Sequence, residues 1–276
     1  MGVALELLAR FGRSKHAHPM TRYLALLAVL SAASLVRADE PPIIAKARAY
    51  VAPDAVLDGV KSIHFVGKIT SDDPSDATKT VSASVEIIFQ KPWQQLLVVN
   101  NGQLVTIGLD DYNVWQRLQD PKDLRRSRII IPPIAMLQRI RADIWENLGF
   151  YRGIEQTGGR LEDRGAAVID GIACEKIAFI HPPNFFYIRY FDQATGRLVL
   201  TETDSGVKIS QVGEIVVKGI RLPKSLVEKQ IRDGKEQTSI YDFSSITVND
   251  TFPDSVFATP QVEPPVHEAA PAQGSP

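Results

Sequence analysis

The sequence has a single cysteine, Cys174, and therefore cannot form an internal disulfide bond. Only five histidines are present, and neither they nor the cysteine occur at the spacing of a metal site. The Gly-x-Ser-x-Gly motif of hydrolases is absent, and Cys174 lies in an apolar strand pattern that keeps a thiol protonated and inert. These absences predict that the chain is not an enzyme and that it uses no metal and no cofactor.

The sequence also has no apolar run as long as the about 20 residues that a membrane-spanning helix needs. Leu24–Leu30 is a shorter run, preceded by Met20 and Arg22 and followed by small residues up to Ala38. This pattern predicts a secretory signal cleaved after Ala38, with a membrane anchor as the alternative. Residues 1–19 then either precede the true start at Met20 or form a long basic leader. We expect export to the periplasm of a Gram-negative cell.

The sequence also has no excess of positive charge. Without residues 1–38, the upstream extension and signal, it carries 26 basic and 31 acidic residues, a net charge of −5. Binding to nucleic acid would require a basic face, so no nucleic acid partner is expected. Residues 39–260 have a size that β-rich folds often fill as one domain, whereas residues 261–276 are rich in Pro and Ala and predict a disordered tail.

Alternating strands make up most of what is present. Ile63–Ile69 and Val81–Phe89 carry apolar side chains at every second position, which predicts a hairpin with one dry face. Turns at 100–102 and 110–111 continue an antiparallel meander toward Trp115. More strands are predicted in the second half of the chain, at 173–180, 185–191, 197–203, 208–212, 214–217, 224–231 and 236–248.

Two segments have helical periodicity instead. A short amphipathic helix is predicted after Pro41-Pro42, and a longer one over Ile134–Leu148, where an apolar stripe ends at Gly149. A sheet closed by its own side chains would not need this stripe. We therefore expect a mainly β (α+β) fold: a strongly curved antiparallel sheet that forms an unclosed β-barrel, with helices plugging its concave side.

The apolar positions of these strands and of the longer helix are the candidate lining of a ligand cavity. Phe185–Phe191 is apolar on both faces, so it is either buried in the core on both sides or lines an apolar cavity. The candidate lining residues share an apolar side chain expected to face the concave side: Val81, Val85, Ile87, Phe89, Trp115, Ile134, Leu137, Ile140, Ile144, Phe186 and Ile188.

A basic cluster precedes the longer helix and consists of Lys122, Arg125, Arg126 and Arg128. It has two interpretations. One is a surface for anionic lipid head groups or a partner protein, and the other is a solvated loop leading into the helix.

Several stretches resemble one family. They are Ile43–Gly67, Asp111–Trp115, Tyr190–Val199 and Gly219–Pro260, the last of which joins an alternating strand to a polar turn and an aromatic anchor. Together they resemble the LolA/LolB-like periplasmic carriers of outer-membrane lipoproteins. The resemblance implies an unclosed barrel with helices in its mouth that holds acyl chains without catalysis. It also implies an interior arginine that holds the helices shut, for which Arg189 is the candidate.

The function implied is a periplasmic binding protein for the acyl chains of a lipid or lipoprotein. Apolar lining suffices for such a carrier, since each buried CH₂ contributes about 0.8 kcal/mol. The alternative is a structural or sensory envelope protein of the same fold, with a filled core and a protein partner. In either case we expect a monomer.

Overall fold

The computed structural model describes residues 40–73 and 76–261. The helices are α2 (Pro42–Val51), α3 (Asp54–Asp58) and α4 (Ile134–Leu148), with short 3₁₀ turns η1 (Ile154–Thr157) and η2 (Asp254–Val256). The strands follow in chain order: β1 (Ser62–Asp73), β2 (Asp76–Gln90), β3 (Gln94–Asn100), β4 (Leu104–Asp110), β5 (Asn113–Asp120), β6 (Asp123–Ile130), β7 (Arg160–Ile169), β8 (Ile172–His181), β9 (Phe185–Asp192), β10 (Leu198–Thr203), β11 (Lys208–Val217), β12 (Ile220–Arg232) and β13 (Lys235–Val248).

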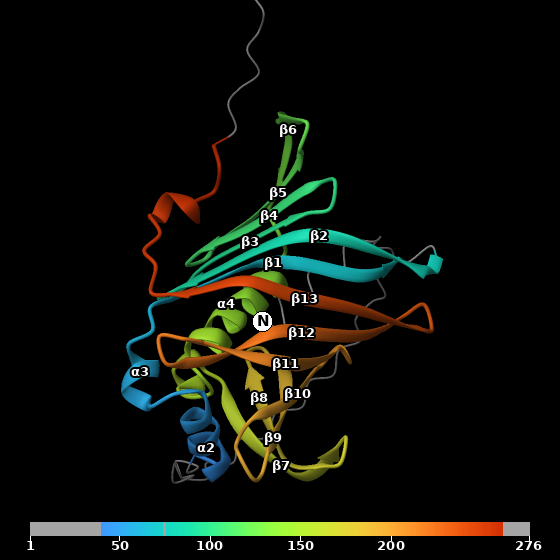
Figure 1. Cartoon of the computed structure of the whole chain (residues 1–276). Coiled ribbons are helices and arrows are strands. Elements are labelled where there is room, and N and C mark those ends of the chain that lie inside the picture. Colours follow the sequence, from blue (N-terminus) through green and yellow to red (C-terminus); the bar gives the residue numbers. More distant parts are fainter. Residues whose placement is uncertain (1–39, 74–75, 262–276) are drawn as a thin grey trace, which may run out of the picture.

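All strands belong to one antiparallel sheet of 13 strands in the order β6-β5-β4-β3-β2-β1-β13-β12-β11-β10-β9-β8-β7. The sheet curves strongly and its two edge strands, β6 and β7, do not pair, so the barrel is unclosed (Figure 1). The first and last strands meet in the middle, where Ile63 pairs with Val248. A bulge interrupts this pairing beside Gly67, at which a Cβ would lie 2.1 Å from the Asp242 carbonyl oxygen. The predicted fold class is confirmed.

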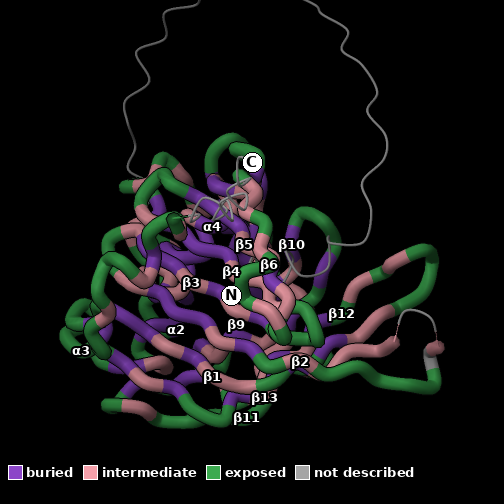
Figure 2. The backbone as a smooth tube through the Cα atoms, turned by 90° about the horizontal axis from the view of Figure 1, so that it is seen from above, coloured by how far each residue is buried: buried purple, intermediate pink, exposed green. Residues whose placement is uncertain are grey.

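Helix α4 lies across the concave side of the sheet (Figure 1). The chain enters it from Pro132-Pro133, which cannot continue a strand ladder, and leaves it at Gly149. Its apolar side chains join those of the concave strand faces in one continuous core. The core thus sits between the helices and the sheet, while the tips of the long hairpins that protrude from it are exposed or partly exposed (Figure 2).

The last described residues pack on the opposite, outer face of the first strands. Phe257 is fully buried there, its ring contacts that of Phe252 edge to face, and its carbonyl oxygen accepts a hydrogen bond of 2.8 Å from Trp115 Nε1. Asn249 also caps the start of β1 through the Lys61 amide, at 2.7 Å. The outer face of this half of the sheet is therefore covered by the chain itself.

The predicted helix Ile134–Leu148 and the meander β3–β5 are found with nearly the expected boundaries. Two strands were not predicted, β6 and β7, and the strands predicted at 208–212 and 214–217 form a single strand, β11. No helix among residues 40–73 and 76–261 is long and apolar enough to cross a membrane. The predicted signal (1–38) lies outside the described residues, as does the predicted tail from residue 262 onward.

Candidate functional site

The underside of α4 forms the apolar half of the candidate site. Leu137, Ile140 and Ile144 are buried and belong to the same core as the concave side chains of β2. The structure thus brings together six of the candidate lining residues, three from the helix and three from the strand: Leu137, Ile140, Ile144, Val85, Ile87 and Phe89.

Five candidate lining residues lie outside the surface that α4 covers, and for three of them, Trp115, Phe186 and Ile188, the expected position on the concave side is wrong. Val81 points toward the concave side of its strand but is 46% exposed, because it lies beyond the part of the sheet that α4 covers. Ile134, in the first turn of α4, is 67% exposed. Trp115 is on the outer face, since its neighbour Val114 points into the core. Phe186 and Ile188 point outward for the same reason, and Ile188 packs on a small separate cluster around Cys174.

A charged cluster forms the other half of the site. Glu146 of α4 is buried between His181 and Arg189, which come from β8 and β9. His181 Nε2 lies 2.6 Å from Glu146 Oε1, and Arg189 forms an ion pair with the other carboxylate oxygen. Burial alone would raise the pKa of Glu146, but the charge of Arg189 and the contact with His181 outweigh it and hold the pKa below its ordinary value. This cluster, hereafter the Glu146 latch, links helix to sheet.

Two aromatic rings flank the guanidinium of Arg189. Its guanidinium lies 4.6 Å from the ring centroid of Phe179 and 5.1 Å from that of Tyr151, distances at which a cation is attracted to an aromatic face. Arg189 was the sequence candidate for the interior arginine, and it faces the concave side. The sequence offered no signal for Glu146 and His181.

Two further contacts fix α4 from both sides. On one side Arg139 forms a double hydrogen bond with Asp204, at 2.9 and 2.7 Å, in the turn after β10. On the other side Arg141 contacts Asp111 at 2.8 Å and stacks over the Trp93 ring at 4.3 Å. These pairs are accessible to water and contribute less than the buried latch. The helix is therefore held at its rim by exposed contacts and at its centre by a buried one.

Arg48 joins the three helices into one unit. It is 2% exposed, and its guanidinium donates to Asp54 at 2.7 Å and Asp58 at 3.0 Å, both in α3. It also donates to the carbonyl oxygens of Gly149 and Phe150, each at 3.0 Å, just after α4. Any displacement of α4 would therefore involve α2 and α3 as well.

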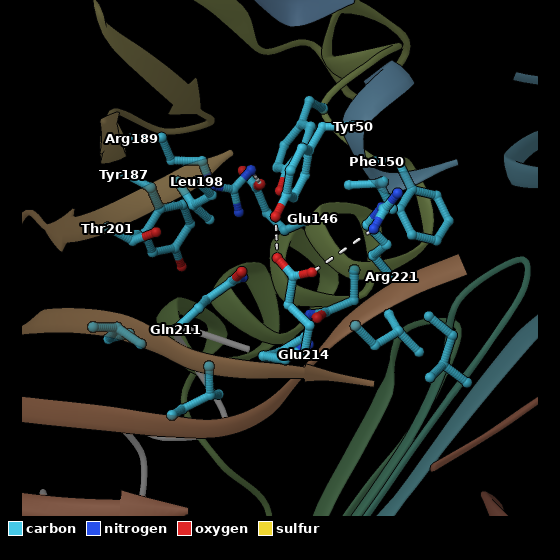
Figure 3. Close-up of a pocket in the computed structure, with 18 of the residues that line it drawn as sticks. Tyr50, Glu146, Phe150, Tyr187, Arg189, Leu198, Thr201, Gln211, Glu214 and Arg221 are labelled. Atoms are coloured by element: carbon cyan, nitrogen blue, oxygen red, sulfur yellow. Dashed lines mark hydrogen bonds and ion pairs between the residues drawn. The ribbon is translucent and has the colours of Figure 1, made fainter. Parts of the chain in front are cut away.

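A cavity of about 110 Å³ remains between these helices and strands β9–β12 (Figure 3). Its lining is mixed: Glu146 and Arg189 lie on one wall, and Glu214 stands between Tyr50 and Arg221 at the other, hydrogen-bonded to Tyr50 and 4.0 Å from Arg221. The cavity is smaller than the ~300–1,000 Å³ of typical small-molecule sites. As the structure stands, it has no room for a long acyl chain.

The basic cluster lies on an edge strand and not in a loop. Arg125, Arg126 and Arg128 belong to β6, and Lys122 to the turn before it; all four are exposed. Asp123 contacts Arg125 at 3.0 Å and Arg126 at 3.6 Å. Charged side chains on an unpaired edge discourage pairing with another chain. Within the described residues, no group of three or more His, Cys, Asp or Glu side chains could hold a metal ion.

Comparison with known proteins identifies this architecture. No protein-family model and no curated sequence matches the chain. A LolA superfamily protein from Nitrosomonas europaea superposes with a TM-score of 0.53 at 13% identity, over 79% of this chain and 96% of that one. The chain has the LolA-like fold. A DUF1329 family protein from Desulfovibrio piger gives a TM-score of 0.52 at 12% identity, over 78% and 95% of the two chains.

A third similar structure is a Vibrio parahaemolyticus domain named as a putative outer membrane lipoprotein-sorting protein, with a TM-score of 0.51, 10% identity and coverage of 78% and 94%. These three neighbours extend along most of the described chain and nearly all of their own. At such identities the likeness concerns the fold, and residue roles have to be argued from this chain's own contacts.

Proposed function

We propose that this chain is a non-enzymatic binding protein of the periplasm that holds the acyl chains of a lipid or lipoprotein on the concave side of its sheet. In this proposal α4 is a lid, its apolar underside and the inner face of β2 form the binding surface, and the Glu146 latch keeps the lid closed. The ligand replaces the contacts that the lid gives up.

One observation supports the proposal: α4 contacts the sheet in two different ways. Its apolar side packs on Val85, Ile87 and Phe89, and its charged side is attached through the Glu146 latch. A purely structural core helix has no need of a buried ion pair, since apolar residues of similar volume are often as stable there. A lid gains from one, because the pair fixes a single closed position.

The size of the remaining cavity sets a condition on this function. About 110 Å³ is too small for an acyl chain, so binding requires α4 to move away from the sheet. Opening exposes apolar surface to water, which costs about 25 cal/mol of free energy per Å². The acyl chain covers the same surface and offsets that cost at about 0.8 kcal/mol per CH₂, so ligands with long chains are favoured.

The test is the binding of a fluorescent fatty acyl probe to the purified protein. Saturable binding is expected, and Val85→Trp should weaken it because Val85 is buried under α4. Val81→Trp is the matched control: it lies on the same face of the same strand but outside the lid, so the same added volume should leave binding unchanged. Failure to bind any acyl probe, with a large loss of stability in Val85→Trp, would refute the carrier.

The filled concave side favours one alternative function. A continuous core with a small residual cavity is also what a structural or sensory envelope protein with a protein partner would have. In that protein Val85→Trp overpacks the core and costs about 1–3 kcal/mol without loss of any ligand. Mass spectrometry of lipid extracted from the purified protein separates the two functions, because only the carrier retains acyl chains.

Export and a monomeric state belong to the same proposal. The basic start, the short apolar run and the small residues before Asp39 support a cleaved signal and hence a periplasmic location. The expected partners are acyl chains, lipoproteins that carry them, or other envelope proteins.

A further inference from the structure

A second cavity lies at the rim of the sheet, between α3, the end of α4 and the β2–β3 turn. Its volume is about 460 Å³, within the ~300–1,000 Å³ of small-molecule sites. Its apolar walls come from Leu57 of α3, Trp93 of the turn, and Ile144, Trp145 and Leu148 of α4. This rim cavity is larger than the one beneath the lid and is available without any movement of α4.

Hydrogen-bond donors without partners converge on the rim cavity. The Trp145 side chain is 9% exposed, and its indole N–H has no acceptor within the described part of the chain. A Cβ built on Gly153 would lie 3.8 Å from Trp145 Nε1 and 3.3 Å from Gln156 Nε2, so these two donors flank the same point. These donors can each give a hydrogen bond to an oxygen atom of a ligand in the cavity.

Three cationic side chains also line this cavity. Arg48 and Arg152 line it, but Arg48 is bound to Asp58, and Arg152 contacts Glu40 at 2.9 Å. Lys91 is the third cation of the lining, and no hydrogen bond or ion pair engages its ammonium group among residues 40–73 and 76–261. Burial lowers the pKa of Lys91, although the residue as a whole is exposed, and the nearby carboxylate of Asp58 acts in the opposite direction.

We propose that the rim cavity binds an amphiphilic anion, whose carboxylate or phosphate contacts Lys91 and Trp145 and whose acyl chain lies along Pro92 and Trp93. The donors supply what an anionic oxygen accepts, and the walls supply what a short apolar chain covers. This site is distinct from the acyl site beneath α4 and goes beyond the proposed function. A cationic amphiphile would meet only Asp58 as a partner, and Arg48 already occupies it.

The experiment titrates the purified protein with three amphiphiles of equal chain length, each below its micelle concentration: dodecanoate, dodecyl phosphate and dodecyltrimethylammonium. Tryptophan fluorescence reports binding, since Trp93 and Trp145 line the cavity. Saturable binding of dodecanoate, dodecyl phosphate or both supports the site, and the preferred one identifies the head group. Equal binding of the cation, or no binding of either anion, overturns the proposal.

Two substitutions of lysine locate the binding. Lys91→Gln should lower the affinity for the anions about tenfold, as expected when a charge-assisted contact is lost. Lys235→Gln, an exposed lysine at the far hairpin, is the matched control and should leave it unchanged. Trp145→Phe removes the indole N–H, keeps most of the volume, and should weaken anion binding as well. Equal affinity of Lys91→Gln and the unmodified protein would overturn the site.

The same measurements separate this site from the lidded one. Val85→Trp alters only the surface beneath α4, so it should leave the Lys91-dependent binding of dodecanoate intact. If the acyl probe fails to bind but dodecanoate binding depends on Lys91, the rim site stands and the carrier function falls. If only Val85→Trp affects binding and Lys91→Gln does not, the rim site falls and the carrier function stands.

Discussion

Replacement of Arg189 by Met should destabilise the protein strongly and change how its stability depends on pH. Arg189 forms an ion pair with Glu146, and the side chains are 9% and 2% exposed, so water screens the pair little. Removing one partner of a buried pair costs about 3–5 kcal/mol, because the other charge stays buried. For a chain of this size that corresponds to a loss of about 6–20 °C in melting temperature.

The pH dependence of stability follows from the pKa of Glu146 with and without Arg189. In the unmodified protein the pKa is lowered from its ordinary value of 4.5, so Glu146 contributes stability above about pH 4.5 that is lost as the pH falls further. Without Arg189, burial is the largest single influence left, and we expect it to outweigh the contact with His181 and to raise the pKa of Glu146 above the unfolded value. The variant then gains from protonation of Glu146, and its stability deficit should shrink from pH 7 to pH 5.

Urea unfolding at several pH values tests this reasoning on four proteins: the unmodified protein, Arg189→Met, a double variant and a control. The double variant Arg189→Met/Glu146→Gln should recover part of the loss at pH 7, because no uncompensated carboxylate remains. Arg126→Met is the control, since an exposed pair such as Arg126 with Asp123 contributes at most about 1 kcal/mol. A deficit in Arg189→Met that is below about 1 kcal/mol, or that stays constant from pH 7 to pH 5, would refute the latch.

Three other outcomes are expected. Intact-mass measurement of the exported protein should give a chain that begins at Asp39, and a mass that retains the residues before Ala38 would contradict cleavage there. Leu137→Asp should lower the free energy of unfolding by several kcal/mol, because the charge falls in a buried apolar contact; an unchanged melting temperature would contradict it. Trp115→Phe should cost about 1 kcal/mol in urea unfolding through loss of its hydrogen bond to Phe257, and no change would show that the outer contact contributes nothing.

The sequence was sufficient for the elements with strong periodicity. Helix α4 has an apolar stripe and ends at Gly149, and in β2 apolar and polar side chains alternate regularly. Both elements could therefore be predicted, and with them the curved sheet. The edge strands β6 and β7 could not, because exposed charged side chains take the place of the apolar alternation on which a strand prediction depends.

The direction in which side chains point was the weaker part of the prediction. A strand that is apolar on both faces, such as Phe185–Phe191, does not show by itself which face is inner. Trp115 was misplaced because its cover, around Phe257, comes from the far end of the chain. The Glu146 latch was missed for a similar reason, since Glu146 and His181 meet only through the curvature of the sheet.

The pairing of β1 with β13 has a consequence for how this protein assembles. The neighbours on either side of this pair follow chain order, so β1–β6 and β7–β13 are two meanders that can each form from residues close in sequence. Their union depends on contacts such as Ile63 with Val248, nearly the whole described length apart, and long-range pairing of this kind forms slowly. Loss of β13 would therefore remove a central strand and divide the sheet into two half-sheets, each with a new unpaired strand. Until its last strand pairs, the chain has two separate half-sheets, and α4 can pack only on the one that contains β2 and β3.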